Sequence, residues 1–225
     1  MPDTTSTHDP KPRLVQIAEH HLAADMLVQG GDWFRGGRGC SIGCFLKDLD
    51  QPGSLPRTTA FQDAARLIYL DVDAEWAARL HLGLFERLPA ERARQFHVEV
   101  ARALTAGGDG SQPDMQRVYH RTMIAVLDVA LRHAGETAAA VSGFRSLHER
   151  ILSGQSVSEE EWVAARGAFG ATSPNAAVAA AWAAVGDVSG FSVWVATEVA
   201  DFCEIASAFI AALRTEALAK AHATT

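Results

Sequence analysis

Cysteine is scarce in this sequence, because 225 residues contain only three, an odd number. So few cysteines exclude a small secreted scaffold held together by disulfides. No secretory signal is predicted either, since residues 1–12 are polar and lack an apolar core. The longest apolar run, Ala176–Val185, is too short and too rich in alanine to span a bilayer. We therefore expect a cytoplasmic protein that does not enter a membrane.

An excess of positive charge is also missing. Acidic residues (27) outnumber basic ones (20), and the formal net charge is −7 at pH 7. Binding to a phosphate backbone needs a basic face, so we expect no nucleic-acid partner. Apolar residues make up 48% and charged residues 21%, which is typical of a globular domain that buries its own core.

The chain divides into a short tail and one domain. Residues 1–11 are rich in threonine, serine, aspartate and proline, which predicts a disordered tail. Residues 12–225 are predicted to form a single helical domain. A sub-boundary is expected near residues 154–158, before an alanine-rich C-terminal part.

Apolar residues recur at helical spacing along most of the chain, and no stretch alternates with period two between hairpin turns. This pattern predicts an all-α, irregular bundle of about eight or nine helices. The only place where a short strand pair is admitted is residues 42–46. Expected helices run from Pro12 toward Gly30, from Thr58 or Thr59 to Tyr69, after Asp73, over 90–106, after Asp114, over 141–151, after Ser158, over 176–185 and over 191–220.

Four helix starts carry capping signals, and at one of them Thr58 or Thr59 is predicted to cap the helix that runs to Tyr69. Asp73 and Asp114 each precede a helical pattern and are predicted to be N-caps. Ser158 and Glu161 have the spacing of a capping box, in which each side chain binds the other residue's backbone N–H.

The most unusual segment is a glycine-rich loop over residues 31–44, with glycines at 31, 36, 37, 39 and 43. If a helix begins near Ser41, Cys40 lies at its positive end, where Arg35 and Arg38 add charge. Such surroundings lower the pKa of a thiol and make it nucleophilic. Cys40 and Cys44 are therefore candidate catalytic thiols, with His20 or His21 as the base.

The same loop is a candidate anion site, because backbone N–H groups and guanidinium groups bind carboxylate or phosphate. Exposed aromatic side chains beside it would suit a ligand or partner surface, although a staple onto the first helix explains them equally well. The candidate ligand-binding residues are Arg35, Arg38, Gly37, Gly39, Trp33 and Phe34.

Other interpretations of the two cysteines stay open. Both are equally well explained as small buried apolar residues beside a tight turn. A reversible disulfide or a metal pair is a further hypothesis, but a structural zinc needs two more ligands. The nearest ones, His20 and His21, point about 100° apart on a helix. No metal and no cofactor is therefore predicted.

The remaining histidines are interpreted as ordinary. His81 and His97 are expected on the solvent side of their helices, and His120, His133 and His148 as packed or surface residues. Cys203 lies on the apolar side of the last helix and is expected in the core.

Several motifs resemble a family of bacterial and phage proteins without an assigned activity. Gln29-Gly30, followed by Gly39-Cys40-Ser41-Ile42-Gly43-Cys44, is similar to the family's N-terminal QG…GCxxGC motif. Residues 75–80 and 85–89 are similar to its EW-A-RL and FE-LP helix, and residues 158–162 to its SEEEW segment. The resemblance spans residues 14–185. It departs where many relatives have a histidine after the second cysteine, since Leu46 and Lys47 stand here, and in the tail, which is less repetitive. It implies a fold and no chemistry.

Two functional hypotheses follow. The first is a small cytosolic enzyme or ligand-binding protein that uses the glycine, arginine and cysteine loop as a thiol or anion site for a small anionic molecule. The alternative is a non-catalytic protein–protein interaction module that forms a homodimer or docks a protein partner through its alanine-rich C-terminal helices. A metal- or redox-responsive regulator ranks below both.

Overall fold

The computed structural model describes residues 10–30, 33–49, 60–108, 112–170 and 199–223. Within these ranges the chain forms nine α-helices, one 3₁₀ helix, η1 (Gly135–Thr137), and one small hairpin, which confirms the all-α prediction. The helices are α1 (Pro10–Ala23), α2 (Ser41–Leu49), α3 (Ala60–Ile68), α4 (Glu75–Arg87), α5 (Ala90–Leu104), α6 (Met115–His133), α7 (Ala138–Leu152), α8 (Glu159–Gly170) and α11 (Val199–Ala223).

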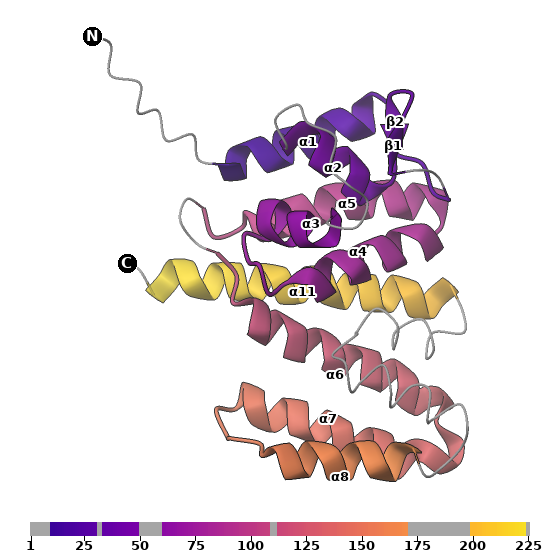
Figure 1. Ribbon diagram of the computed structural model, residues 1–225, viewed down its shortest axis with the longest axis vertical. Coiled ribbons are helices and arrows are strands. Elements are labelled where there is room, and N and C mark those ends of the chain that lie inside the picture. The colour runs from indigo at the N-terminus through magenta and orange to yellow at the C-terminus, as the bar shows by residue number, and fades with distance from the viewer. Residues whose placement is uncertain (1–9, 31–32, 50–59, 109–111, 171–198, 224–225) are drawn as a thin grey trace.

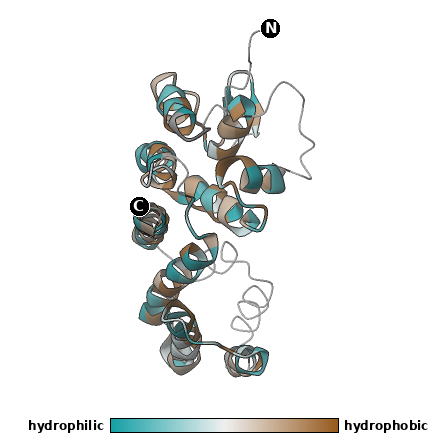
Figure 2. Cartoon of the chain, turned by 90° about the vertical axis from the view of Figure 1, so that its left-hand side faces the viewer, coloured by the Kyte–Doolittle hydropathy of each residue, from teal (hydrophilic) through white to brown (hydrophobic). Residues whose placement is uncertain are grey.

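The helices stack in two groups with α11 between them (Figure 1). One group contains α1 to α5 and the hairpin, and the other contains α6, α7 and α8. The C-terminal helix α11 packs against α4 and α5 on one side and against α6 on the other. Figure 2 shows the same order from the side, with α11 seen nearly end-on. Because α11 contacts both groups, one apolar core extends through the described helices from α1 to α7 and into α11.

Two of the predicted caps, at Asp114 and Ser158, are confirmed, and the cap predicted at Thr58 or Thr59 lies outside the described residues. The Asp114 side chain accepts hydrogen bonds from the N–H groups of Gln116 and Arg117, both at 3.1 Å. At the start of α8, the Ser158 N–H donates to Glu161 at 2.8 Å and the Glu161 N–H donates to Ser158 Oγ at 3.3 Å. The cap predicted at Asp73 is wrong, because α4 begins at Glu75 without a side-chain cap.

The strand pair admitted at residues 42–46 is also wrong, since these residues lie in α2. A short apolar run cannot distinguish a strand from a buried helix. The hairpin lies just before it: β1 (Phe34–Arg35) pairs antiparallel with β2 (Arg38–Gly39). Gly36 and Gly37 form its two-residue turn, and both have positive φ (60° and 83°), which the turn requires and glycine adopts readily.

Other helix boundaries differ in detail from the predictions. The first helix begins at Pro10 and ends at Ala23, well before the glycines at 30 and 31. The predicted helix over 176–185 and the first residues of the predicted helix over 191–220 lie outside the described residues, as do residues 1–9 of the predicted tail. None of the helices that the structure describes is both long and apolar enough to cross a membrane.

Candidate functional site: a buried polar chain beneath the cysteine loop

The glycine-rich loop is tightly packed at its C-terminal end. A Cβ atom added to Gly39 or to Gly43 would overlap the backbone carbonyl of Trp33. Glycine is therefore needed at both positions for the close approach of two backbone segments. Helix α2 begins at Ser41, as predicted, so Cys40 does lie at a helix start.

Both cysteines of the loop are buried. Cys40 is 3% exposed and Cys44 is fully enclosed, with its thiol donating to the carbonyls of Gly39 and Met26 at 3.5 and 3.6 Å. Burial raises the pKa of Cys40 to about 11, although the Gly43 and Ile42 N–H groups oppose it. Burial raises the pKa of Cys44 to about 12. The expected lowering of a thiol pKa is therefore wrong, because desolvation outweighs the helix start.

The two arginines are directed to the surface. The Arg38 guanidinium donates to the carboxylate of Asp25 at 2.8 Å and to its carbonyl at 3.0 Å, and half of its side chain is exposed. Arg35 is exposed on β1, and Gly37 is exposed in the hairpin turn. Positive charge thus gathers on the outside of the hairpin, while the thiols lie inside.

The two aromatic residues of the loop are half-buried. The Trp33 ring packs edge-on against Phe61, with ring centroids 5.2 Å apart. Lys47 Nζ lies 6.0 Å above the Phe34 ring. These contacts tie the start of the hairpin to helices α3 and α2, so packing accounts for both aromatic residues.

The two histidines proposed as bases differ in exposure. His20 is exposed, whereas His21 is fully buried and faces α2 and α5. Its Nε2 lies 3.0 Å from Asp48 Oδ2, and its Nδ1 lies 3.1 Å from His97 Nε2. Both ring nitrogens of His21 are therefore engaged away from the thiols.

From His97 the hydrogen bonds continue into the core. His97 Nδ1 lies 2.7 Å from Ser41 Oγ, and Ser41 Oγ lies 2.6 Å from His81 Nε2. His81 Nδ1 lies 2.9 Å from the hydroxyl of Tyr69. Five hydrogen bonds thus connect six side chains, which we call the polar chain: Asp48, His21, His97, Ser41, His81 and Tyr69.

The polar chain joins every helix of the N-terminal group. His21 comes from α1, Ser41 and Asp48 from α2, His81 from α4 and His97 from α5, and Tyr69 directly follows α3. Buried polar groups that satisfy one another make a core specific to one arrangement of its helices. The polar chain thus connects the five helices of the N-terminal group through their buried side chains.

Only Asp48 reaches the surface, with 30% of its side chain exposed. The histidines are fully buried, and burial lowers the pKa of His81 to about 3 and that of His97 well below its usual value. The pKa of His21 is lowered by burial as well, although Asp48 opposes this. All three imidazoles are therefore neutral at pH 7.

The expectation that His81 and His97 face solvent is wrong. The His97 ring stacks on Phe45 with centroids 4.1 Å apart, and the His81 ring packs edge-on against Phe96 at 5.2 Å. The expectation failed because helical periodicity assigns polar residues to the solvent side. A single sequence does not show which of them find polar partners in the core. One local signal did point to burial, since each of these two histidines is next in sequence to apolar residues that face inward.

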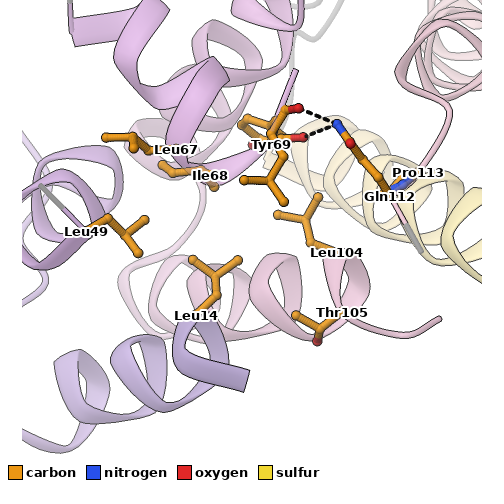
Figure 3. A pocket seen from close by; sticks show the side chains of 10 residues that line it. Leu14, Leu49, Leu67, Ile68, Tyr69, Leu104, Thr105, Gln112 and Pro113 are labelled. Atoms are coloured by element: carbon orange, nitrogen blue, oxygen red, sulfur yellow. Dashed lines mark hydrogen bonds between the residues drawn. The ribbon is translucent and has the colours of Figure 1, made fainter. Parts of the chain in front are cut away.

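A small cavity lies beside the Tyr69 end of the chain (Figure 3). Its volume is about 20 Å³, which is room for a single water molecule. The Gln112 amide closes the end of α3 by donating to the carbonyls of Tyr69 and Leu70 (Figure 3). The lining is otherwise mostly apolar: Leu14, Leu49, Leu67, Ile68, Leu104, Thr105 and Pro113.

Ser41 is the residue whose significance the sequence analysis missed. Gly39-Cys40-Ser41-Ile42-Gly43 has the G-x-S-x-G spacing that places a serine nucleophile at a strand-to-helix turn. Here the motif joins β2 to α2, and Ser41 is bonded to His97, which His21 and Asp48 orient in turn. Ser41 is nevertheless fully buried, and the packing of Trp33 already requires both glycines.

An open hollow lies on the other side of the molecule, between α6, the end of α7 and α11. Its volume is about 280 Å³. Small side chains of α11 form one wall. We call this feature the α11 hollow, and it is lined by Arg121, Ile124, Leu152, Ala208, Ala211, Ala212 and Thr215.

The described residues contain no group of three or more histidine, cysteine or carboxylate side chains placed to hold a metal ion. Comparison of this chain with protein-family models, curated proteins and solved structures found no match. The resemblance to the GCxxGC family therefore remains an expectation.

Proposed function

We propose that this chain is a non-catalytic helical module that pairs with a second copy of itself through α11. The α11 hollow is the observation that carries the proposal. In contrast, the serine, the histidines and the tyrosine of the polar chain and the thiols of Cys40 and Cys44 are buried and hydrogen-bonded to one another or to the backbone. A surface that excludes water on association needs an apolar floor and no unpaired charge, and the hollow offers both.

The hollow and an exposed leucine on the same helix are complementary. Leu218 is 40% exposed and follows Thr215 by three residues. If two copies of α11 pack antiparallel about a two-fold axis at Thr215, Leu218 of each copy stands opposite Ala212 of the other. Such an interface is self-complementary, because each copy provides both the protruding side chain and the hollow.

Charge does not oppose this pairing. Among the described residues that line the hollow, the one charged side chain is Arg121, and its guanidinium binds the buried carboxylate of Glu216 at 2.6 Å. Arg117 binds the second oxygen of the same carboxylate at 3.1 Å. Both guanidinium groups at this rim are thus already bound to a carboxylate of their own chain before a second copy arrives.

The test is the molar mass in solution as a function of concentration, measured by analytical ultracentrifugation. We expect a dimer that dissociates on dilution, and we expect Leu218→Glu and Ala211→Leu to give monomers, the first by adding charge and the second by filling the hollow. Val163→Glu is the matched control, because Val163 is 54% exposed on α8, away from the hollow. A wild type that stays monomeric at millimolar concentration contradicts the proposal.

A second candidate function is favoured by the bonding of Ser41. Its hydroxyl contacts His97, and His97 is oriented by His21 and Asp48, as in a serine-dependent transferase or hydrolase. A fluorophosphonate probe tests it: Ser41 Oγ would bond to phosphorus, fluoride would leave, and the hydroxyl proton would pass to His97 Nδ1. Stoichiometric labelling that Ser41→Ala abolishes would establish this function. Unlabelled native protein would rule out an accessible nucleophile at Ser41.

A further inference from the structure

The number of hydrogen bonds in the polar chain equals the number of protons that its side chains can donate. Five bonds connect six groups. Tyr69 and Ser41 supply one hydroxyl proton each, and three neutral imidazoles supply one N–H each. An ionised Asp48 supplies none. Five protons therefore fill five bonds, one in each, with no proton left over.

This balance fixes the direction of every bond. A carboxylate only accepts, so His21 donates from Nε2 to Asp48. His21 Nδ1 is then bare and accepts from His97 Nε2–H. His97 Nδ1 accepts from the Ser41 hydroxyl.

The same rule continues from the serine to the tyrosine. Ser41 Oγ, having donated its proton, accepts from His81 Nε2–H. His81 Nδ1 is bare and accepts from the Tyr69 hydroxyl. All three histidines consequently carry their proton on Nε2, and all five bonds point from Tyr69 toward Asp48.

We propose that the charge of Asp48 sets the direction of the whole polar chain, so that a change of ionisation at the surface reverses the tautomers of buried histidines as far as Tyr69. When Asp48 is neutral, its hydroxyl donates to His21 Nε2. Each imidazole then donates from Nδ1, and Ser41 donates to His81. The reversed chain also fills its five bonds, and the Tyr69 proton lies outside it.

Asp48 is the group whose charge can set the direction of the hydrogen bonds in the polar chain. Among the described residues, few other charged groups lie near the polar chain, and none of them takes part in its five hydrogen bonds. Tyr69, which directly follows α3, His81 of α4 and His97 of α5 belong to the polar chain themselves, and Glu86 of α4 acts on the neighbouring Cys40. The neighbouring groups are Arg13, which donates to the Asp48 carbonyl at 2.9 Å, His20 beside His21, Lys47 at 3.8 Å from Asp48 Oδ1, and Cys44.

The device is distinct from the proposed dimer, since it lies in the N-terminal group and uses no residue of the α11 hollow. Its consequence is long-range coupling between α1 and the end of α3. The Tyr69 ring packs near Phe209 of α11, with centroids 6.4 Å apart. In the reversed chain the Tyr69 hydroxyl accepts from His81 instead of donating to it, so its proton becomes a free donor in the core where the N-terminal group meets α11.

Nitrogen-15 NMR of the histidine rings tests the proposal at pH 7.5 on the full chain. We expect the wild type to show His21, His97 and His81 all protonated on Nε2. Asp48→Asn keeps a side chain that accepts or donates, so we expect the three tautomer populations to shift toward Nδ1–H. Glu19→Gln is the matched control, because Glu19 is an exposed carboxylate on α1 that binds Arg102 and is not part of the chain.

Two results would overturn the proposal. The first is any of the three imidazoles protonated mainly on Nδ1 in the wild type. The second is unchanged tautomers in Asp48→Asn. The wild-type spectrum alone decides the first point, so the test does not depend on the folding of a variant.

Discussion

The described part of the molecule contains two groups of hydrogen-bonded histidines that are built differently. In the polar chain, three histidines connect five helices and end on the carboxylate of Asp48. Between α6 and α7, His120 and His148 form a single hydrogen bond, Nδ1 to Nδ1 at 2.8 Å, beside Trp162. A single partner is thus enough to hold an imidazole in the core. Only a continuous series of hydrogen bonds makes several helices depend on one protonation pattern.

The largest expected effect is the loss of the central imidazole of the chain. His97→Ala removes the stack on Phe45 and leaves Ser41 and His21 without their shared partner. A cavity together with unsatisfied polar groups lowers the free energy of unfolding by about 4 kcal/mol. Urea denaturation measures it, with His120→Ala as the control at about 1 kcal/mol. Equal losses of unfolding free energy in His97→Ala and His120→Ala would show that the polar chain stabilises the fold no more than a single hydrogen-bonded pair does.

Acid is expected to destabilise the protein by a similar amount. Four enclosed histidines, His21, His81, His97 and His148, have folded-state pKa values lowered by burial, to about 3 for His81 and His148. The unfolded chain binds their protons below about pH 6.5, and the folded chain does not. Stability is therefore fully present above pH 6.5 and is lost as the pH falls toward the folded pKa values.

Between pH 6.5 and 5.5 we expect a loss of about 3 kcal/mol, about 1 kcal/mol for each of His81, His97 and His148, whose pKa values are lowered furthest. Urea denaturation at several pH values in this interval measures it. A free energy of unfolding that stays constant across the interval would contradict the neutral, buried state of these rings.

A smaller effect separates the two histidine groups. His148→Gln removes one of the four titrating groups and leaves the polar chain intact. The acid loss over the same interval should therefore decrease by about 1 kcal/mol, whereas the stability at pH 8 changes little. If the acid loss is unchanged, the polar chain alone accounts for it.

The smallest effect concerns the sulfur atoms near the polar chain, and it is kinetic. With pKa values raised to about 11 and about 12, Cys40 and Cys44 have very little thiolate at pH 7. We expect both to be alkylated at least about a hundredfold more slowly in the native protein than in denaturant. Cys203 is half-buried on α11 and should react first. Rapid native labelling of Cys40 would restore the thiol hypothesis.

Much of the fold could be predicted from local patterns. Helix periodicity and the signals at Asp114 and Ser158 are local, so they located the cores and starts of several helices. The cap at Asp73 failed because the same residue type also serves turns, and here Asp71 accepts the Asp73 N–H. The predicted start of α2 at Ser41 was correct.

The candidate site was predicted only in its location. The loop around Cys40 does adjoin the most polar part of the core, but the reactive-thiol environment expected there is absent, because burial raises the thiol pKa values. Ser41, His81 and His97 are 16 to 56 residues apart, and no local rule brings them together. The G-x-S-x-G spacing was the one local signal that pointed to Ser41.

The sequence by itself determined that this chain is helical, where most of its helices begin, and that a glycine-rich turn precedes α2, since these properties depend on neighbouring residues. Only the tertiary structure decided which side chains are enclosed and which polar atoms meet. The physical reason is desolvation: the same histidine or cysteine is a charged surface group in water and a neutral, hydrogen-bonded member of the core when helices from five parts of the chain close around it.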